Sequence, residues 1–134
     1  MTAAEAGKQL EPFLGTELGT GDWSLLSPYR IRKFADAVGR SGEEVPVLML
    51  LSLIPGLVST INLPIDAPRT ALNYGLDTCR AGMPVQAGDR IRARAALLAI
   101  EEGDTWLQIK RRVTLENKAG EQVLEADTLT RLYW

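Results

Sequence analysis

The stretch from Val45 to Ile65 constrains the fold more than any other feature, because its 21 consecutive residues carry no charged side chain. A segment of that length is long enough to cross a bilayer as a helix. The Pro55-Gly56 pair in its middle and several hydroxyl side chains argue against a membrane span. The run from Val47 to Ile54 is apolar on all sides, and such a helix needs cover on all sides. We therefore expect a buried central helix.

The composition predicts one globular domain over residues 1–134, with a mobile N-terminus over residues 1–12. The chain is 46% hydrophobic and 24% charged, which suffices for a core. Its formal net charge of -2 offers no general attraction to nucleic acid or anionic lipid, so we expect neither as a partner. Cys79 is the single cysteine and no signal peptide is visible, so we expect a cytoplasmic protein without disulfides.

The chain contains no histidine, which excludes much of enzyme chemistry. Ser-His and Cys-His nucleophile systems, histidine-ligated metals and imidazole acid-base catalysis all need that side chain. Any catalysis therefore has to use carboxylates, tyrosine, lysine or Cys79. We also expect no bound metal and no resident cofactor.

The remaining patterns predict strands around the apolar helix. A short strand over residues 22–26 precedes an amphipathic helix that Ser27 caps, that starts at Pro28 and that ends at Gly39. Four extended runs follow at residues 71–79, 90–100, 106–116 and 123–133, separated by short glycine-containing turns. Because short connections suit antiparallel neighbours, we expect an α+β fold with an antiparallel sheet curled around the apolar helix.

Five fragments in a fixed order carry a family resemblance that extends from about Glu17 to the C-terminus. They are Glu17-Leu18-Gly19 with Asp22-Trp23, Arg30-Ile31 with Phe34 to Gly39, Leu51 to Pro55, Asn73 to Asp77 with Arg80, and Pro84-Val85 with Gly88 to Arg92. These fragments resemble MaoC-like dehydratase domains, the family of the R-specific enoyl-CoA hydratases. The resemblance implies a hot-dog fold, in which the sheet wraps a central helix, a dimer with one longer sheet, and acyl-thioester tunnels near the subunit interface.

The resemblance also implies an Asp and a His after the first helix and a His-Gly pair at the start of the central helix. This sequence departs there, because Arg40 to Pro46 contains neither Asp nor His, and Pro46-Val47 is the nearest match to the His-Gly pair. The fold carries over, whereas the hydratase dyad does not. The start of the central helix, at Val47 and Leu48, keeps N–H groups that can bind an oxyanion.

Four residues are weak catalytic candidates. Glu43 and Glu44 are the carboxylates of the replaced connection, and either would act as a base if burial raised its pKa. A solvated turn is the plainer interpretation of that pair. Tyr74 and Asp77 lie in a fragment that resembles the family, and the two-residue period of a strand places Asp77 on the same face as Asn73.

The candidate ligand-binding residues are Asn73, Tyr74, Gly75, Arg80, Val47 and Leu48. The resemblance implies that the amide and the phenol of Asn73-Tyr74-Gly75 orient a bound thioester. A structural interpretation stays open, in which Gly75 marks a bulge. Arg80 would help to bind the phosphates of coenzyme A or of an acyl carrier. The coenzyme A thioester would then be a substrate or ligand, not a cofactor.

Arg111 lies in phase with the apolar residues of the strand over 106–116, where an unpaired guanidinium is costly. It therefore needs a partner. If the following turn pairs Glu116 with Gln122, Arg111 lies opposite Asp127 on the same face. We predict an Arg111–Asp127 ion pair that fixes the strand register or closes a subunit interface.

Two functions from different classes follow from this sequence. The first is a MaoC-like hot-dog protein that lacks the standard hydratase dyad, binds an acyl thioester or a similar apolar ligand and acts as the non-catalytic partner of a hydratase, in a homodimer or a heterodimer with a related chain. The second is an active lyase of the enoyl-CoA hydratase type, or an isomerase, that uses carboxylate and tyrosine groups in place of histidine. A third hypothesis, a structural protein with a filled interior, predicts no ligand at all.

Overall fold

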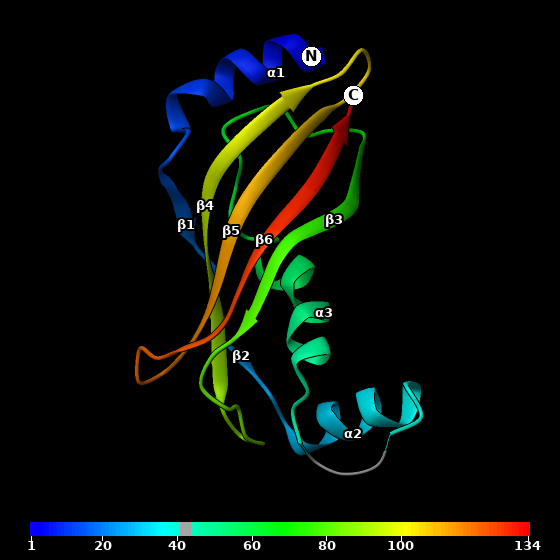
Figure 1. The fold of residues 1–134 in the computed structure, drawn as a ribbon, viewed down its shortest axis with the longest axis vertical. Helices are drawn as coiled ribbons and strands as arrows, with labels where there is room; N and C mark the ends of the chain where they lie inside the picture. The colour runs from blue at the N-terminus through cyan, green and yellow to red at the C-terminus, as the bar shows by residue number, and fades with distance from the viewer. Residues whose placement is uncertain (41–43) are drawn as a thin grey trace.

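The computed structural model describes residues 1–40 and 44–134. Within these ranges, six strands form one antiparallel sheet in the order β1-β4-β5-β6-β3, with β2 paired to β4. The strands are β1 (Glu17–Thr20), β2 (Ser24–Leu25), β3 (Thr70–Ala81), β4 (Arg90–Glu102), β5 (Leu107–Asn117) and β6 (Gln122–Tyr133). The helices are α1 (Ala3–Leu10), α2 (Pro28–Ala37) and α3 (Val47–Leu57), with a 3₁₀ turn, η1, at Glu11–Phe13. Figure 1 shows the long curved strands with α3 lying against one face, which confirms the α+β prediction.

The apolar helix α3 packs its buried side against the sheet, as predicted. Met49, Leu50 and Ile54 are at most 4% exposed and belong to the main core. Leu48, one residue before Met49, is 68% exposed. The prediction of cover on all sides is therefore wrong for the single chain, because one sheet face covers only one side of a helix. None of the described helices is long and apolar enough to span a membrane.

Helix α2 forms where the sequence predicts it. The hydroxyl of Ser27 accepts a hydrogen bond from the backbone N–H of Arg30 at 3.2 Å, which satisfies one free donor of the first turn. Gly39 follows the last turn with φ at 73°, a left-handed conformation that favours glycine. The predicted strand over 22–26 is shorter, because only Ser24–Leu25 pairs with β4, and β1 lies before it.

Most of residues 1–12, for which the sequence predicts a mobile N-terminus, form α1 and the start of η1. Thr2 and Glu5 form a reciprocal capping box, in which each side chain accepts from the other's backbone N–H. Ala6 and Leu10 are fully buried. They join a second core with Leu97, Leu107, Ile109 and Leu132. Helix α1 thus covers the end of the sheet that α3 does not reach (Figure 1).

Strand β3 is a sheet edge, and its position corrects the expectation that successive strands are neighbours. It pairs with β6, so the short turn after Ala81 leads to β4 across the width of the sheet. Gly82 makes this path feasible, since a Cβ there would collide with the backbone carbonyl of Gln122. Every residue of β3 is exposed in the single chain. The sheet therefore presents one long edge beside α3.

Candidate functional site

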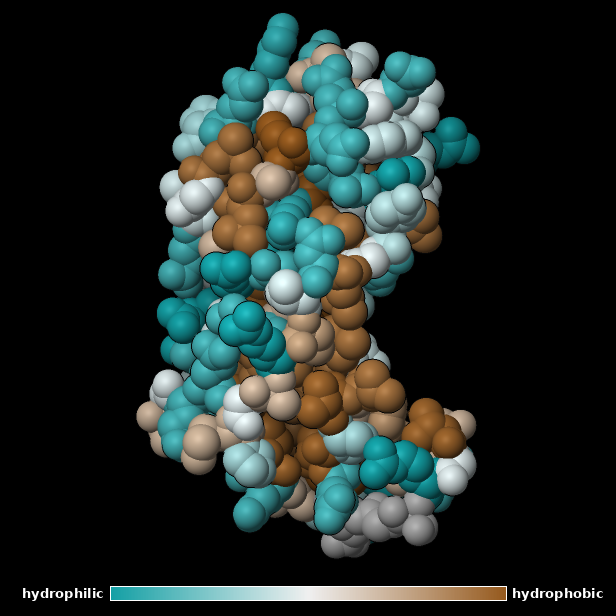
Figure 2. All heavy atoms as spheres, in the orientation of Figure 1, coloured by the Kyte–Doolittle hydropathy of each residue, from teal (hydrophilic) through white to brown (hydrophobic). Residues whose placement is uncertain are grey.

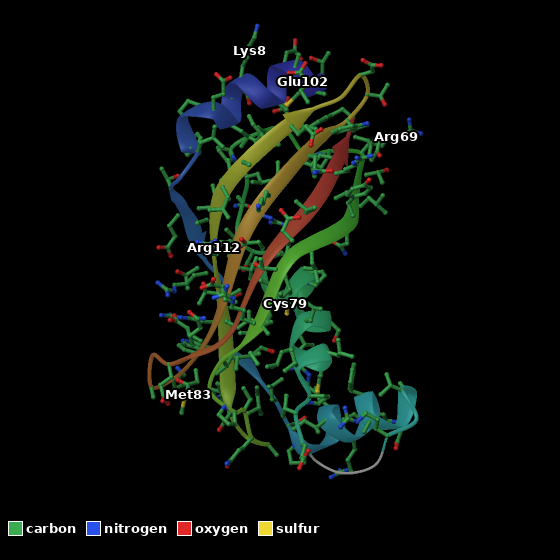
Figure 3. All side chains as sticks on the ribbon, in the orientation of Figure 1. Lys8, Arg69, Cys79, Met83, Glu102 and Arg112 are labelled. Carbon is green, nitrogen blue, oxygen red and sulfur yellow. The ribbon has the colours of Figure 1, made fainter. Side chains whose placement is uncertain are left out.

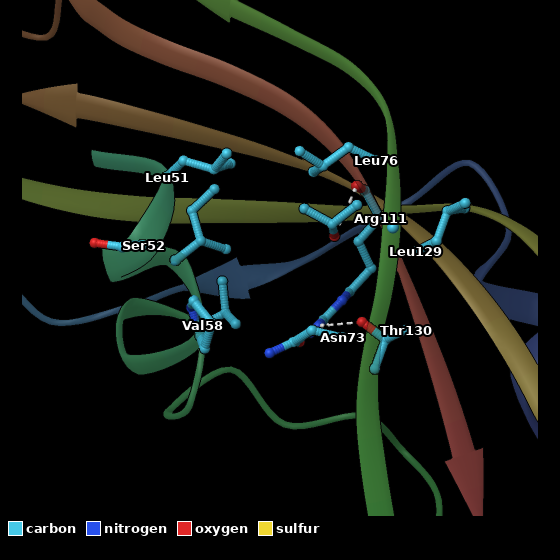
Figure 4. Close-up of a pocket in the computed structure, with 12 residues that line it drawn as sticks. Leu51, Ser52, Val58, Asn73, Leu76, Arg111, Leu129 and Thr130 are labelled. Atoms are coloured by element: carbon cyan, nitrogen blue, oxygen red, sulfur yellow. Dashed lines mark hydrogen bonds between the residues drawn. The ribbon is translucent and has the colours of Figure 1, made fainter. Parts of the chain in front are cut away.

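A pocket of about 270 Å³ lies between α3 and the sheet (Figure 4). Helix α3 and strand β3 supply most of its apolar wall, and the strands add a few polar groups. Its lining residues are Leu51, Ser52, Ile54 and Pro55 from α3, Val58 directly after α3, Asn73, Gly75 and Leu76 from β3, Arg111 from β5, and Thr128, Leu129 and Thr130 from β6. A mostly apolar cavity with few polar groups is typical of a small-molecule site.

Arg111 supplies the positive charge of this pocket. Side chains alternate along β5, so Arg111 shares the α3 side of the sheet, the inner face, with the buried residues Ile109 and Val113. Its Nη2 donates a long hydrogen bond of 3.4 Å to the hydroxyl of Thr130, drawn in Figure 4. Its Nε is buried without a hydrogen-bond partner among the described residues. Burial also lowers the pKa of Arg111 from its ordinary value.

The predicted Arg111–Asp127 ion pair is wrong. Glu116 does pair with Gln122, as assumed, but the register shifts directly beside that pair, so Leu115 meets Leu124. The extra residue in β6 moves Asp127 opposite Arg112. A one-residue slip moves a side chain to the other sheet face, so Arg111 and Asp127 lie on opposite faces.

Arg112 lies on the outer face of the sheet, away from α3 (Figure 3), and there it binds Asp127. Its Nε and Nη2 donate to the two carboxylate oxygens at 2.9 and 3.1 Å. Asp127 is 4% exposed. Hydrogen bonding from Arg112 is the main cause that lowers the pKa of Asp127 from its ordinary value. The buried carboxylate is therefore stabilised as a structural ion.

Two of the six candidate ligand residues line the pocket and four do not. Asn73 and Gly75 line the pocket, whereas Tyr74 between them lies on the outer face with its ring 3.7 Å from the guanidinium carbon of Arg131. The alternation of side chains along a strand explains this separation. The register shift between Asn73 and Gly75 agrees with the bulge interpretation of Gly75. The other three, Val47, Leu48 and Arg80, are exposed and are not among the residues that line the pocket.

The weak catalytic candidates do not converge on one point. Glu44 lines a different surface pocket, next to Val45 and Pro84, and Glu43 lies outside the described residues. Asp77 pairs with Lys110 at 2.7 Å. Lys110 directly precedes Arg111 and faces away from the pocket. The expectation that Asp77 and Asn73 share a face is therefore wrong, because the register shift between Asn73 and Gly75 interrupts the two-residue period.

Several pocket residues were not singled out from the sequence. Thr128 and Thr130 follow the alternation of β6, and such a pattern is also typical of an ordinary strand. Ser52 is the polar residue of an otherwise apolar helix segment, which was a usable signal. Among residues 1–40 and 44–134, no cluster of three or more His, Cys, Asp or Glu side chains has the geometry of a metal site.

Two curated relatives resemble most of this chain in sequence. The 3-hydroxyacyl-thioester dehydratase Z of Mycobacterium tuberculosis (strain ATCC 25618 / H37Rv) is 27% identical over 133 residues, which cover 87% of each protein. Nodulation protein N of Rhizobium leguminosarum bv. viciae is 30% identical over 121 residues, covering 77% of this chain and 75% of the relative. No protein-family model matches the chain.

Three solved structures share the fold over most of their length. The monoamine oxidase regulatory protein from Archaeoglobus fulgius has a TM-score of 0.76 with 19% identity, over 90% of each chain. The MaoC-like dehydratase from Rhodospirillum rubrum has a TM-score of 0.70 with 16% identity, over 90% of this chain and 92% of the other. The HadBC (3R-hydroxyacyl-ACP dehydratase) complex from Mycobacterium tuberculosis has a TM-score of 0.68 with 18% identity, over 88% and 96%.

A curved antiparallel sheet that packs a central helix and leaves an apolar pocket beside it defines a hot-dog protein. The sequence relatives narrow this class. The chain belongs to the MaoC-like dehydratase family, as the resemblance implied.

Proposed function

We propose that this chain binds the acyl part of a thioester in the pocket between α3 and the sheet and has no hydratase activity of its own. The absence of histidine from the whole sequence carries the proposal. Hydration of an enoyl thioester needs a base for water and an acid for the adjacent carbon, each within hydrogen-bond reach of the substrate. The pocket offers Arg111, Asn73 and hydroxyl groups, none of which is a base at neutral pH.

The same pocket supports the binding half of the proposal. Its α3 wall is apolar, and burial of an acyl chain there contributes about 0.8 kcal/mol for each CH₂ group. The two curated relatives include a dehydratase of 3-hydroxyacyl thioesters, which is consistent with an acyl thioester as the ligand class.

A related hot-dog chain that carries the Asp and the His is the proposed partner. Strand β3 has an unpaired edge, and Leu76 on it is 43% exposed. Leu48 of α3 is exposed as well, and Figure 2 shows hydrophobic residues gathered over the α3 region. Long apolar edges of this kind normally pair with another strand. HadBC and ChsH1-ChsH2, which are complexes of two named components, share this fold and support a heteromeric role.

The purified chain is expected to show no turnover with a panel of enoyl and 3-hydroxyacyl thioesters. Native mass spectrometry is expected to show one bound acyl thioester for each chain. Turnover that is lost in Tyr74→Phe or Asp77→Asn would instead establish the second hypothesis, an active hydratase that uses carboxylate and tyrosine groups.

A matched pair of variants tests whether the ligand occupies this pocket. Leu51 and Leu53 are both partly buried on α3, but only Leu51 lines the pocket beside Arg111. Leu51→Trp fills that space and is expected to weaken thioester binding at least ten-fold, whereas Leu53→Trp is expected to leave it within about three-fold. Calorimetry measures the affinities and circular dichroism checks the fold. Equal losses in both variants would contradict the proposed location.

Leu76→Lys is expected to abolish pairing with the proposed partner chain and to leave a monomer, because pairing along β3 would bury the added ammonium beside α3. Leu14→Lys is the control, since Leu14 is 39% exposed and precedes β1 at the opposite edge of the sheet. Size-exclusion chromatography with light scattering measures the mass at micromolar protein. A Leu76→Lys protein that remains dimeric would refute pairing through β3.

A further inference from the structure

Among the described residues, Arg111 differs from three other arginines of the sheet in its lack of an anionic or aromatic partner. Arg112 binds Asp127, and Arg92 forms an ion pair with Glu116 at 2.7 Å. Arg131 stacks on the rings of Tyr74 and Trp106. Among the described residues, Arg111 donates one long hydrogen bond to Thr130, and its Nε has no partner.

An unpaired guanidinium in such surroundings is unfavourable for folding. Burial of a charge costs free energy unless hydrogen bonds and an opposite charge compensate for it. The neighbours of Arg111 along the inner face of β5 are Ile109 and Val113, both fully buried. An apolar residue at position 111 would pack there without that cost. The burial of the Arg111 guanidinium is therefore explained if an anion in the pocket binds it.

The pocket has the shape of a site for an apolar ligand with one polar end. Asn73 pairs with Thr130 across the β3–β6 ladder, and Thr130 accepts the hydrogen bond from Arg111. Figure 4 shows the side chains of Asn73, Arg111 and Thr130 close together on the strand wall. Leu51 of α3 and Val58, directly after α3, form the facing wall. One wall thus offers hydrogen-bond donors and the other offers apolar contact.

We propose that this pocket binds a carboxylate carried by an apolar ligand, with the guanidinium of Arg111 as its receptor and the Asn73 amide as a second donor. If the proposed function holds, on which this step rests, the substrates are acyl thioesters that end in a carboxylate. The fork of a guanidinium matches the two oxygens of a carboxylate. A single negative charge also neutralises Arg111, whereas a phosphate dianion would leave excess charge in an apolar pocket.

Binding of two thioesters of equal chain length tests the proposal. Adipyl and hexanoyl thioesters of N-acetylcysteamine differ in the terminal carboxylate, and neither contains the phosphates of coenzyme A. The intact chain is expected to bind the adipyl thioester roughly 10- to 100-fold more tightly, as a charge-assisted hydrogen-bonded pair allows. Arg111→Met is expected to lose this preference and to bind the hexanoyl thioester within about three-fold of the intact chain. Isothermal titration calorimetry measures all affinities.

Arg94→Met is the matched control, because it removes the same charge from the exposed outer face of the sheet. It is expected to keep the full preference for the adipyl thioester. Free hexanoate is a third probe, and it distinguishes a carboxylic acid from a thioester as the source of the carboxylate. Binding of hexanoate alone, lost in Arg111→Met, would support the carboxylate site and refute the thioester function.

Equal binding of adipyl and hexanoyl thioesters would overturn the carboxylate site and leave the proposed function standing. Loss of the preference in Arg94→Met as well as in Arg111→Met would also overturn it, since the preference would then reflect net charge. Absence of binding for all three probes would refute both proposals. Thermal unfolding checks that Arg111→Met is folded, and we expect its Tm to be equal to or above that of the intact chain, because the buried charge is removed.

Discussion

Replacing Leu50 with alanine is expected to lower the free energy of unfolding by about 2–5 kcal/mol, the range for a buried leucine. Leu50 is 3% exposed and packs in the core between α3 and the sheet. Alanine is a better helix former than leucine, so the loss measures packing and not helix propensity. Urea unfolding followed by circular dichroism gives the free energy.

Leu48→Ala is the control for this substitution, two residues away on the same helix. Leu48 is 68% exposed, so the free energy of unfolding of the isolated chain is expected to change by less than about 0.5 kcal/mol. If a second chain covers Leu48, the loss of stability caused by Leu48→Ala grows with protein concentration. The loss caused by Leu50→Ala does not depend on protein concentration. Similar effects of both substitutions at every concentration would contradict the orientation of α3.

Arg112→Leu is expected to lower Tm by roughly 5–10 °C at pH 7, because it leaves the buried carboxylate of Asp127 without its bidentate partner. The pKa of Asp127 in the folded chain is lowered chiefly by hydrogen bonding from Arg112. A lowered pKa contributes stability that is fully present above the unfolded value of about 4 and is lost as the pH falls through the folded value.

The difference between the intact chain and Arg112→Leu is therefore expected to be largest above pH ~5 and to be smaller at pH ~3, which lies below the unfolded carboxyl's pKa of about 4. Thermal unfolding at both pH values measures it. Arg112→Lys keeps the charge but loses the two-point geometry, so an intermediate Tm is expected. A difference of the same size at both pH values would show that lost packing, not the carboxylate, causes the effect.

Periodicity predicted most of the fold. The apolar run after Pro46 forms α3, the capped amphipathic segment forms α2, and the four extended runs form β3 to β6. Local patterns predict these elements, because apolar residues recur every three to four residues in helices and every two residues in strands. The Thr2–Glu5 capping box was present in the sequence as well, so α1 was open to prediction.

The candidate site was predicted only in part. The position of Arg111 on the apolar face of its strand is confirmed. Asn73 and Gly75 line the pocket, and their role in ligand binding stays a prediction. The arginine that pairs with Asp127 could not be predicted. A bulge beside Glu116 places Arg112 opposite Asp127, where the sequence predicts Arg111. The bulge between Asn73 and Gly75 likewise moves Asp77 to the face opposite Asn73.

The sequence by itself determined which segments are helices and strands, that the central helix is apolar and that imidazole chemistry is excluded. The tertiary structure decided the strand order, the face on which each charged residue of β3, β5 and β6 lies, and the enclosure of Arg111 by α3. The physical reason is that periodicity is a local property of the chain. A bulge or a strand pairing instead depends on residues far apart in sequence, and a shift of one residue moves a side chain from one face of the sheet to the other.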